Sequence, residues 1–293
     1  MVRDKACAEE ADKMARGLTG RSARGFQEAR LDGGSAWLAV IPLESLGLDL
    51  DSLTFRDAVA LRFGLPLPEA LPQACPSCGQ TMSVDHALKC KKGGWVSKRH
   101  QAVLRAWKRY LEMAGVTPLF EEPYLIPVRH GAAVRPGTTK ALDARADLVG
   151  RGVFAVGKDA YFDMVVVDTG AASYGNRPTM KILESHERRK RTEYEDRITP
   201  LGSFTPLACS VYGTLGPAAM MTARRVARRY DDGREERDAV LDLHHVLIQT
   251  AVLKATSLCL RGRSWLVMPQ AADVGELEDP SQALADAGVR ADI

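Results

Sequence analysis

Apolar residues recur at helical spacing in the first part of this chain and at strand-like spacing later. Residues 54–63 and 96–114 place apolar side chains three and four positions apart, which predicts an amphipathic helix in each segment. Lysine and arginine occupy the opposite face of the second segment, so we expect it to be a basic helix. Prolines within residues 66–72 predict an extended connection between the two segments.

Beyond these helices, strand-like and helical segments alternate. The clearest strand is Tyr161–Asp168, where β-branched and aromatic residues dominate. Shorter strand-like pieces precede it at residues 124–128 and 146–149. A polar helix, another strand and two more helices are expected after it, at residues 180–198, 204–212, 218–230 and 239–261. This order predicts a mixed α/β fold with a central mixed sheet flanked by helices.

Length and composition bound the domain organisation. The chain has 293 residues, of which 45% are hydrophobic, so it can bury a large core and still carry a smaller appended unit. We predict a weakly structured leader, a helical segment with a cysteine-rich motif, an α/β domain and an acidic disordered tail, at residues 1–34, 35–115, 116–268 and 269–293. The net charge of +3 is too small to indicate a polyanionic partner by itself.

Four potential metal ligands lie close together in the sequence. They are Cys75, Cys78, His86 and Cys90. Three thiolates and an imidazole can complete a tetrahedral shell around one Zn²⁺, so we expect the local fold to depend on a structural zinc ion. A zinc site of this kind can also be a simple structural staple that never touches nucleic acid.

The remaining cysteines and the charged amino-terminal residues bear on location. Three cysteines remain outside the motif, widely spaced and odd in number, which favours a reducing compartment. The sequence pattern indicates neither a signal peptide nor an apolar stretch long enough to cross a bilayer, so an intracellular protein without a membrane partner is expected.

Cationic residues are dense directly after the cysteine motif and again near residue 190. The candidates for contacts with nucleic-acid phosphates are Lys91, Lys92, Lys98, Arg99, Arg105, Lys108, Arg109, Arg188 and Arg189. A zinc knuckle next to such a basic segment favours nucleic acid as the partner. The alternative for each run is a solvated helix face without a partner.

One carboxylate interrupts the most apolar strand. Asp163 lies near its start, and a buried carboxylate there needs a compensating partner. Asp147 belongs to the preceding strand-like piece, and a hairpin would bring it opposite Asp163, where two carboxylates can hold Mg²⁺. Each aspartate alone is equally well explained by a salt bridge at a strand edge. Lys190 and Tyr194 lie four residues apart on the following helix and so share one face.

These residues, in this order, resemble the PD-(D/E)XK nuclease core. Val165 occupies the position where that motif has its lysine, so Lys190 would take the role from the next helix. The whole set is similar to the restriction-enzyme-like endonuclease of site-specific non-LTR retrotransposons, which combines a Cys-Cys-His-Cys knuckle, two acids and a Lys-x-x-x-Tyr helix. The resemblance covers residues 35–264. Ala146 departs from the family, which has proline there, and Gln101 stands where asparagine is usual.

The resemblance implies a metal-dependent DNA endonuclease, the strand-nicking module of a retroelement. Asp147 and Asp163 would hold catalytic Mg²⁺, Lys190 would stabilise developing charge or orient the nucleophile, and Tyr194 would position phosphate or the lysine. Double-stranded DNA, and also the RNA of the element, would be the partners. A reverse transcriptase domain or protein would lie upstream, since this chain is too short to contain one, and the expected location is the nucleus.

Two other functions stay open at this point. One is a noncatalytic zinc-containing nucleic-acid-binding protein from a degraded retroelement, and the other is an interaction scaffold. The geometry separates them, because catalysis requires Asp147 and Asp163 within one coordination span of each other and Lys190 in the same pocket. His100 is expected to support the fold near the cysteine motif, and His244 and His245 are expected to pack without a chemical role.

Overall fold

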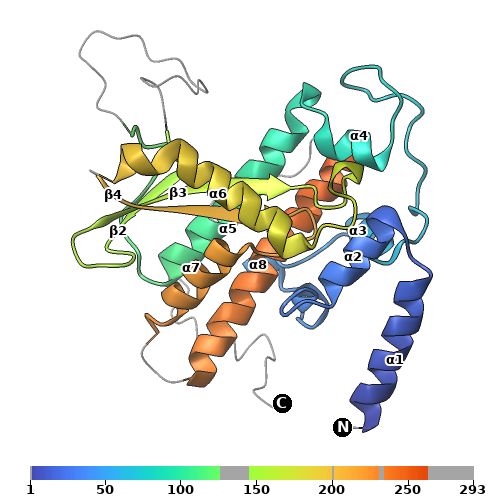
Figure 1. Cartoon of the computed structure of the whole chain (residues 1–293), viewed down its shortest axis with the longest axis horizontal. Helices are drawn as coiled ribbons and strands as arrows, with labels where there is room; N and C mark the ends of the chain where they lie inside the picture. Colours follow the sequence, from blue (N-terminus) through green and yellow to red (C-terminus); the bar gives the residue numbers. More distant parts are fainter. Residues whose placement is uncertain (1, 126–144, 200, 231–233, 263–293) are drawn as a thin grey trace.

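The computed structural model describes residues 2–125, 145–199, 201–230 and 234–262. Figure 1 shows a central sheet with helices on both of its sides. The predicted α/β class with a mixed sheet flanked by helices is confirmed. The predicted acidic tail and most of the strand expected at residues 124–128 lie outside the described residues.

The helices are α1 (Val2–Arg16), α2 (Gly20–Ala29), α3 (Ser52–Phe63), α4 (Val84–Lys89), α5 (Trp95–Met113), α6 (Thr179–Ile198), α7 (Pro217–Ala227) and α8 (Arg234–Arg261). Four 3₁₀ turns accompany them, η1 (Ala36–Leu38), η2 (Glu44–Leu46), η3 (Lys92–Gly94) and η4 (Ala172–Tyr174). The strands are β1 (Leu119–Glu121), β2 (Leu148–Arg151), β3 (Asp159–Val167) and β4 (Gly202–Ser210). The predicted basic helix therefore corresponds to α5 and the predicted polar helix to α6.

The four strands lie in the order β1-β2-β3-β4. The first three form antiparallel pairs, and Leu148 of β2 pairs with Phe162 of β3. Strand β4 runs parallel to β3, with Thr205 beside Phe162. A parallel pair cannot be closed by a tight turn, so a long crossover is required, and α6 provides it.

The two faces of β3 are buried by different helices, as the alternation of its side chains requires. On one face, Tyr161 packs with Tyr194 of α6, and Val167 packs with Ile182 of the same helix. The opposite face, which includes Phe162, belongs to the main core formed with α5, α7 and α8. The long polar helix α6 is therefore one wall of a layer that contains Asp163.

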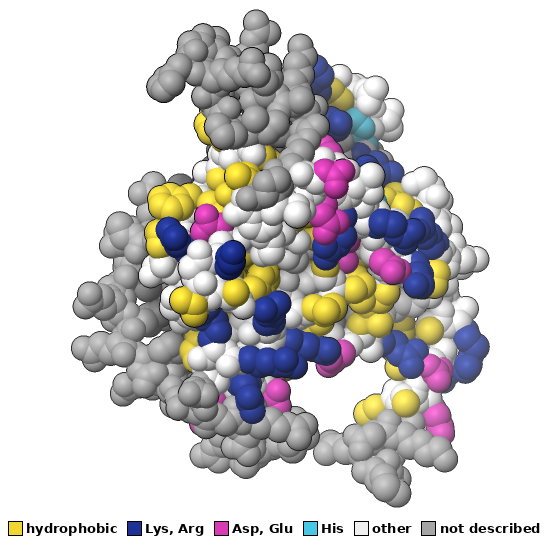
Figure 2. All heavy atoms as spheres, turned by 60° about the vertical axis from the view of Figure 1, so that its left-hand side comes forward, with side chains coloured by type: hydrophobic (Ala, Val, Ile, Leu, Met, Phe, Trp, Pro, Cys, Tyr) yellow, Lys and Arg dark blue, Asp and Glu magenta, His cyan; other side chains and the backbone are white. Residues whose placement is uncertain are grey.

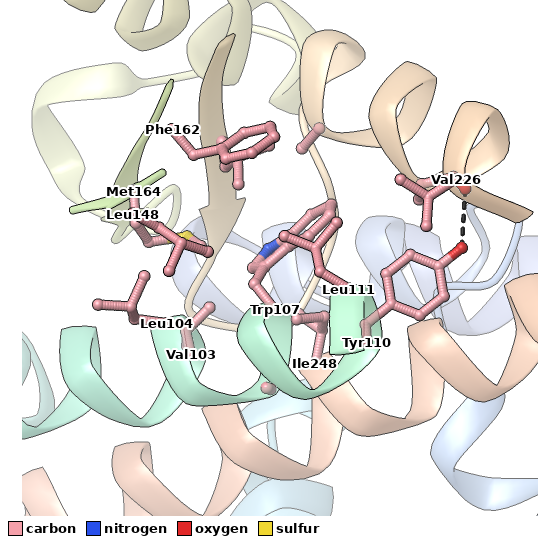
Figure 3. Close-up of a cluster of buried hydrophobic side chains, with 14 of the residues drawn as sticks. Val103, Leu104, Trp107, Tyr110, Leu111, Leu148, Phe162, Met164, Val226 and Ile248 are labelled. Atoms are coloured by element: carbon pink, nitrogen blue, oxygen red, sulfur yellow. Dashed lines mark hydrogen bonds between the residues drawn. The ribbon is translucent and has the colours of Figure 1, made fainter. Parts of the chain in front are cut away.

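The main core lies between the sheet and helix α5, with α7 and α8 completing it (Figure 3). Trp107 is fully buried and faces Phe162 of β3 and Ile248 of α8. The Tyr110 hydroxyl donates a hydrogen bond to the Ala223 carbonyl at 2.8 Å, so the buried polar atom is satisfied. This packing fixes α5, the helix that directly follows the cysteine motif.

The prediction of a weakly structured leader at residues 1–34 is wrong. Residues 2–16 and 20–29 form α1 and α2, and α2 is anchored by buried polar side chains. Glu28 is fully buried and accepts hydrogen bonds from Thr169, Thr179 and Ser210. These partners lie far along the chain, so a pattern of local apolar residues could not reveal them.

Helix α8 packs against both the sheet core and the amino-terminal segments. Leu253 lies in a cluster with Trp37 and Ala58, so residues 35–63 share a core with the carboxyl-terminal helix. The prediction that no stretch is long and apolar enough to cross a bilayer is wrong by length and composition, because Glu236–Arg261 meets that test. However, 94% of its apolar window is buried inside the fold, which is also the property of a core helix.

Candidate functional site

The four residues of the cysteine motif converge in space. Their ligand atoms all lie within 4.8 Å of one another, and the motif forms the one cluster of three or more potential ligands found among the described residues. A bridge between Ala74 and Thr81 closes the turn that holds Cys75 and Cys78, while helix α4 carries His86 and is followed directly by Cys90. We call these four residues the Cys3His cluster.

The spacing of these atoms fits a tetrahedral metal. The Sγ atom of Cys90 lies 3.9 Å from that of Cys75 and 3.8 Å from that of Cys78, and Cys78 Sγ lies 3.3 Å from His86 Nε2. Thiolates bound to one zinc at about 2.3 Å sit about 3.8 Å apart. The six cysteines are free thiols, so no disulfide competes for these sulfurs. The cluster can therefore bind a metal ion such as zinc.

Local backbone geometry supports the same cluster. A backbone hydrogen bond from Ser77 is the main cause that lowers the pKa of Cys75, to about 6, which favours the thiolate form that a metal requires. Gly93 adopts a left-handed conformation with φ of 75°, and a Cβ there would collide with the Ser77 side chain. The chain thus needs glycine where it leaves the cluster and enters α5.

The two predicted acids lie on adjacent strands. The register that pairs Leu148 with Phe162 continues to Asp147, whose backbone N–H donates to the Phe162 carbonyl at 3.0 Å. This places Asp147 opposite Asp163, as the hairpin prediction required. Asp163 is buried, with a side chain 5% exposed. Its charge interacts with that of Asp147, so both carboxylates contribute to one electrostatic site.

Helix α6 brings the predicted lysine to the buried acid. The Nζ atom of Lys190 lies 2.8 Å from Oδ2 of Asp163. The same ammonium lies 5.2 Å from the ring centre of Tyr194, one turn along the helix, so the tyrosine face supports its charge. Tyr194 is buried in a cluster with Tyr161 and Phe204. The structure thus brings Asp163, Lys190 and Tyr194 together.

Burial and charge raise the pKa of Asp163 to about 6. Removal from water is the largest cause, and repulsion by Asp147 adds to it, while Lys190 and His100 oppose the shift. A carboxyl with this pKa changes protonation near neutral pH, which is typical of functional sites and also occurs in structural ion pairs.

His100 is a member of this site that the sequence analysis did not assign. Its Nε2 atom lies 3.1 Å from Oδ2 of Asp147 and 3.2 Å from the Met164 carbonyl. Burial lowers the pKa of His100, but Asp147 outweighs it, so the pKa is raised above 6.5. In the sequence, His100 stands within the basic run of α5, and this position predicted only a structural role for it.

The acids and His100 do not form a ready-made metal cluster. Within the described residues, the Cys3His cluster is the one place where three or more potential ligand atoms converge, and the two acids and His100 do not form a second. Oδ2 of Asp147 already accepts a hydrogen bond from the Met164 N–H at 2.6 Å. We call Asp147, Asp163, Lys190 and His100 the acidic pocket. Its two carboxylates supply oxygen ligands, which Mg²⁺ prefers.

Six of the predicted phosphate contacts are exposed: Lys91, Lys92, Lys98, Arg105, Arg188 and Arg189. Lys98 lies over the ring of Trp95, at 4.5 Å from its centre. Lys108 is half-buried and paired with Glu121 at 2.9 Å. Figure 2 shows lysine and arginine side chains in several groups on one face, separated by acidic and apolar side chains. On the face drawn, the cations do not merge into one continuous patch.

Two of the arginines predicted to contact phosphate donate hydrogen bonds to backbone carbonyls of the protein instead. Arg99 is only 2% exposed and donates to the Leu88 carbonyl at 3.1 Å, so its assignment to nucleic-acid binding is wrong. Arg109 is half-buried and donates to the Leu46 carbonyl at 2.7 Å, and burial lowers its pKa. Both lie on α5, where helical spacing turns part of a basic run toward the core.

Comparison with protein-family models gives no match, and comparison with curated proteins gives none either. The geometry of the Cys3His cluster and of the acidic pocket therefore carries the functional argument.

Proposed function

We propose that this chain is a metal-dependent DNA endonuclease with a PD-(D/E)XK-like core and a zinc knuckle. It would act in the nucleus as the nicking module of a non-LTR retroelement, together with an upstream reverse transcriptase. The observation that carries the proposal is the Lys190 ammonium at 2.8 Å from a buried Asp163 that stands opposite Asp147 in the sheet. The ordered set of zinc ligands, two acids and Lys-x-x-x-Tyr supports it.

The pocket residues have defined tasks in this proposal. Asp147 and Asp163 would hold Mg²⁺, which would neutralise phosphate charge and lower the pKa of water. Lys190 would place its fixed positive charge beside the phosphate, where burial makes it more effective than in water. The ring of Tyr194 holds the lysine in place. The exposed lysines near the Cys3His cluster would contact the DNA backbone without reading its sequence.

A plasmid-nicking assay tests the catalytic assignment. Purified full-length protein is incubated with supercoiled plasmid and Mg²⁺, beside the variants Asp163→Asn and Asp159→Asn. Asp159 begins the same strand, and its side chain is 40% exposed, so it is the matched control. We expect Asp163→Asn to lose nicking by about 100-fold or more and the control to retain it. Equal nicking by all three proteins would show that the activity comes from elsewhere.

One observation favours a second function. Oδ2 of Asp147 is engaged by Met164 and His100, and the pocket lacks the compact ligand arrangement of the Cys3His cluster. This fits a noncatalytic nucleic-acid-binding protein that keeps the fold of a nuclease. Binding of DNA and zinc without nicking in Mg²⁺ or Mn²⁺ is the result that this alternative requires.

A further inference from the structure

Tyr174 and His186 form a hydrogen-bonded pair beside the acidic pocket. The Tyr174 hydroxyl lies 2.7 Å from His186 Nε2, and a guanidinium nitrogen of Arg189 lies 3.4 Å from Nδ1 of the same ring. His186 and Lys190 are four residues apart on α6, so their Cβ atoms lie about 6 Å apart on one face. The pair is therefore a direct neighbour of the lysine that contacts Asp163.

The protonation pattern of this pair leaves one hydrogen available. A guanidinium can only donate, so Nδ1 of His186 accepts from Arg189, and Nε2 carries the ring hydrogen. Nε2 then donates to the Tyr174 oxygen, which leaves the hydroxyl hydrogen for an acceptor outside the pair. Burial, followed by the charges of Arg189, Arg177 and Lys190, lowers the pKa of His186 and keeps the ring neutral.

Positive charge gathers around the pair without a close ion-pair partner among the described residues. Arg177 and Arg189 are exposed, and among the described residues no carboxylate lies within ion-pair distance of either guanidinium. The negative charge of Asp168 acts on Tyr174, but its carboxylate is held by two hydrogen bonds from Arg21, at 2.7 and 2.9 Å. Each guanidinium uses one nitrogen inside the protein, since Arg177 donates to the Lys181 carbonyl at 3.1 Å and Arg189 lies against His186. The group thus presents a hydroxyl donor and the remaining N–H groups of two exposed guanidinium groups.

The backbone under this group is fixed by the amino-terminal helix α2. Buried Arg24 donates to the Gly175 carbonyl at 3.1 Å and to the Arg177 carbonyl at 2.6 Å. A third hydrogen bond, at 3.1 Å, reaches the Thr179 hydroxyl at the start of α6. The segment that carries Tyr174 and Arg177 is therefore ordered before any ligand arrives, which lowers the entropic cost of binding.

We propose that Tyr174, Arg177, His186 and Arg189 form a binding site for a phosphodiester group of the DNA strand, next to the phosphate held at Lys190. The site binds through two guanidinium groups and one neutral hydroxyl, a set that suits a singly charged diester. The identity of the ligand as DNA rests on the proposed function. The site adds a direction for the bound DNA strand, which would run along α6 from Lys190 toward η4.

Salt-dependent DNA binding tests this site without requiring cleavage. Binding of a fluorescent duplex to full-length protein is followed by anisotropy, with Ca²⁺ replacing Mg²⁺. We expect Arg177→Gln and Arg189→Gln each to reduce the slope of log K against log salt by about 1. Tyr174→Phe should weaken binding about tenfold and leave the slope unchanged, because it removes a hydrogen bond and no charge.

Two exposed cations serve as charge-matched controls. Arg151 and Lys158 lie at the β2–β3 turn, which leads into the start of β3, whereas η4 follows the end of β3. Arg151→Gln and Lys158→Gln should retain the wild-type slope. Unchanged slopes for Arg177→Gln and Arg189→Gln would overturn the site, as would unchanged affinity for Tyr174→Phe or absence of DNA binding. The nicking assay is a separate test. If the binding variants behave as expected but Asp163→Asn still nicks plasmid, only the catalytic assignment is overturned and the proposed phosphodiester site remains.

Discussion

The imidazole of His100 and the carboxylate of Asp147 lie 3.1 Å apart, although His100 belongs to α5 and Asp147 directly precedes β2. Nε2 of His100 faces two acceptors, Asp147 and the Met164 carbonyl, so this nitrogen carries the hydrogen and donates to them. The Met164 N–H donates to the same Asp147 oxygen. One oxygen of the carboxylate is thereby fixed, and the orientation of the other follows from it.

Removal of the His100 imidazole should weaken Mg²⁺-dependent nicking. His100→Ala frees the Asp147 side chain to rotate, and the loss of an outer-shell partner of a metal ligand typically costs about 10- to 100-fold. The measurement is the nicking rate as a function of Mg²⁺ concentration. We expect the half-saturating concentration of Mg²⁺ to rise, with a smaller change in the maximal rate.

His100→Gln provides the matched control, because its amide can still donate a hydrogen bond to Asp147. It should recover part of the lost Mg²⁺ affinity. If alanine and glutamine variants both behave as wild type while remaining folded, His100 does not position Asp147.

The ion pair between Lys190 and Asp163 should also be visible in stability. Lys190→Met leaves the Asp163 carboxylate buried without its partner, so we expect the free energy of unfolding to fall by about 3 kcal/mol. The expected loss lies at the low end of the range for breaking buried ion pairs because the lysine side chain is 18% exposed. Urea unfolding of both single variants and of the Asp163→Asn/Lys190→Met double variant measures the coupling. Additive effects in this cycle would mean that the pair contributes nothing.

The local elements of the site could be predicted from the sequence. Ligand spacing identified the Cys3His cluster, and the expected hairpin predicted that Asp147 would lie opposite Asp163. Both are short-range patterns in which the backbone geometry alone determines the neighbours. Helical spacing likewise predicted that Lys190 and Tyr194 would lie together.

The contacts that join distant segments could not be predicted in this way. The partners of Glu28 and Arg24 lie on α6, on β4 and in the loops on either side of η4. Because these segments are distant in sequence, the α2 region was predicted to be a charged, weakly structured leader. The contact of His100 with Asp147 depends on how α5 crosses the end of β2, and no sequence pattern encodes that crossing angle. Buried Arg99 was misassigned for the same reason, since only packing shows which basic residues point inward.

Zinc removal should unfold the cluster locally. The segment at residues 73–95 contains the six-residue helix α4 and the 3₁₀ turn η3, and Cys75 and Cys78 lie in a turn outside both elements. Chelation should therefore raise hydrogen exchange across residues 73–95 while β3, β4 and α8 stay protected. The metal content is checked by native mass spectrometry before and after chelation.

A pair of cysteine variants separates ligand loss from general thiol effects. Cys78→Ser removes a ligand and should abolish stoichiometric zinc binding, whereas Cys7→Ser, an exposed cysteine outside the cluster, should not. Unchanged exchange after verified loss of metal would show that the segment folds without zinc.

His244 lies in the main core between two aromatic rings. Its ring centre is 4.3 Å from that of Trp107 and 4.1 Å from that of Tyr110, and the side chain is fully buried. Neither ring nitrogen has a hydrogen-bond partner, which also holds for the adjacent His245. Burial, with a smaller effect of His245, lowers the pKa of His244 well below 6.5. The expected packing role agrees with this environment.

This burial makes stability depend on pH in one direction. The unfolded chain binds a proton at His244 near pH 6.5 and the folded chain does not, so the free energy of unfolding rises with pH through this range and falls as pH drops below about 6.5. His244→Met removes the titrating group and fills a similar volume. Relative to wild type, its stability should improve by up to about 1.4 kcal/mol per pH unit below pH 6.5. Urea unfolding from pH 8 to about pH 5.5 measures the difference, and parallel pH profiles for the two proteins would place the acid sensitivity at other groups.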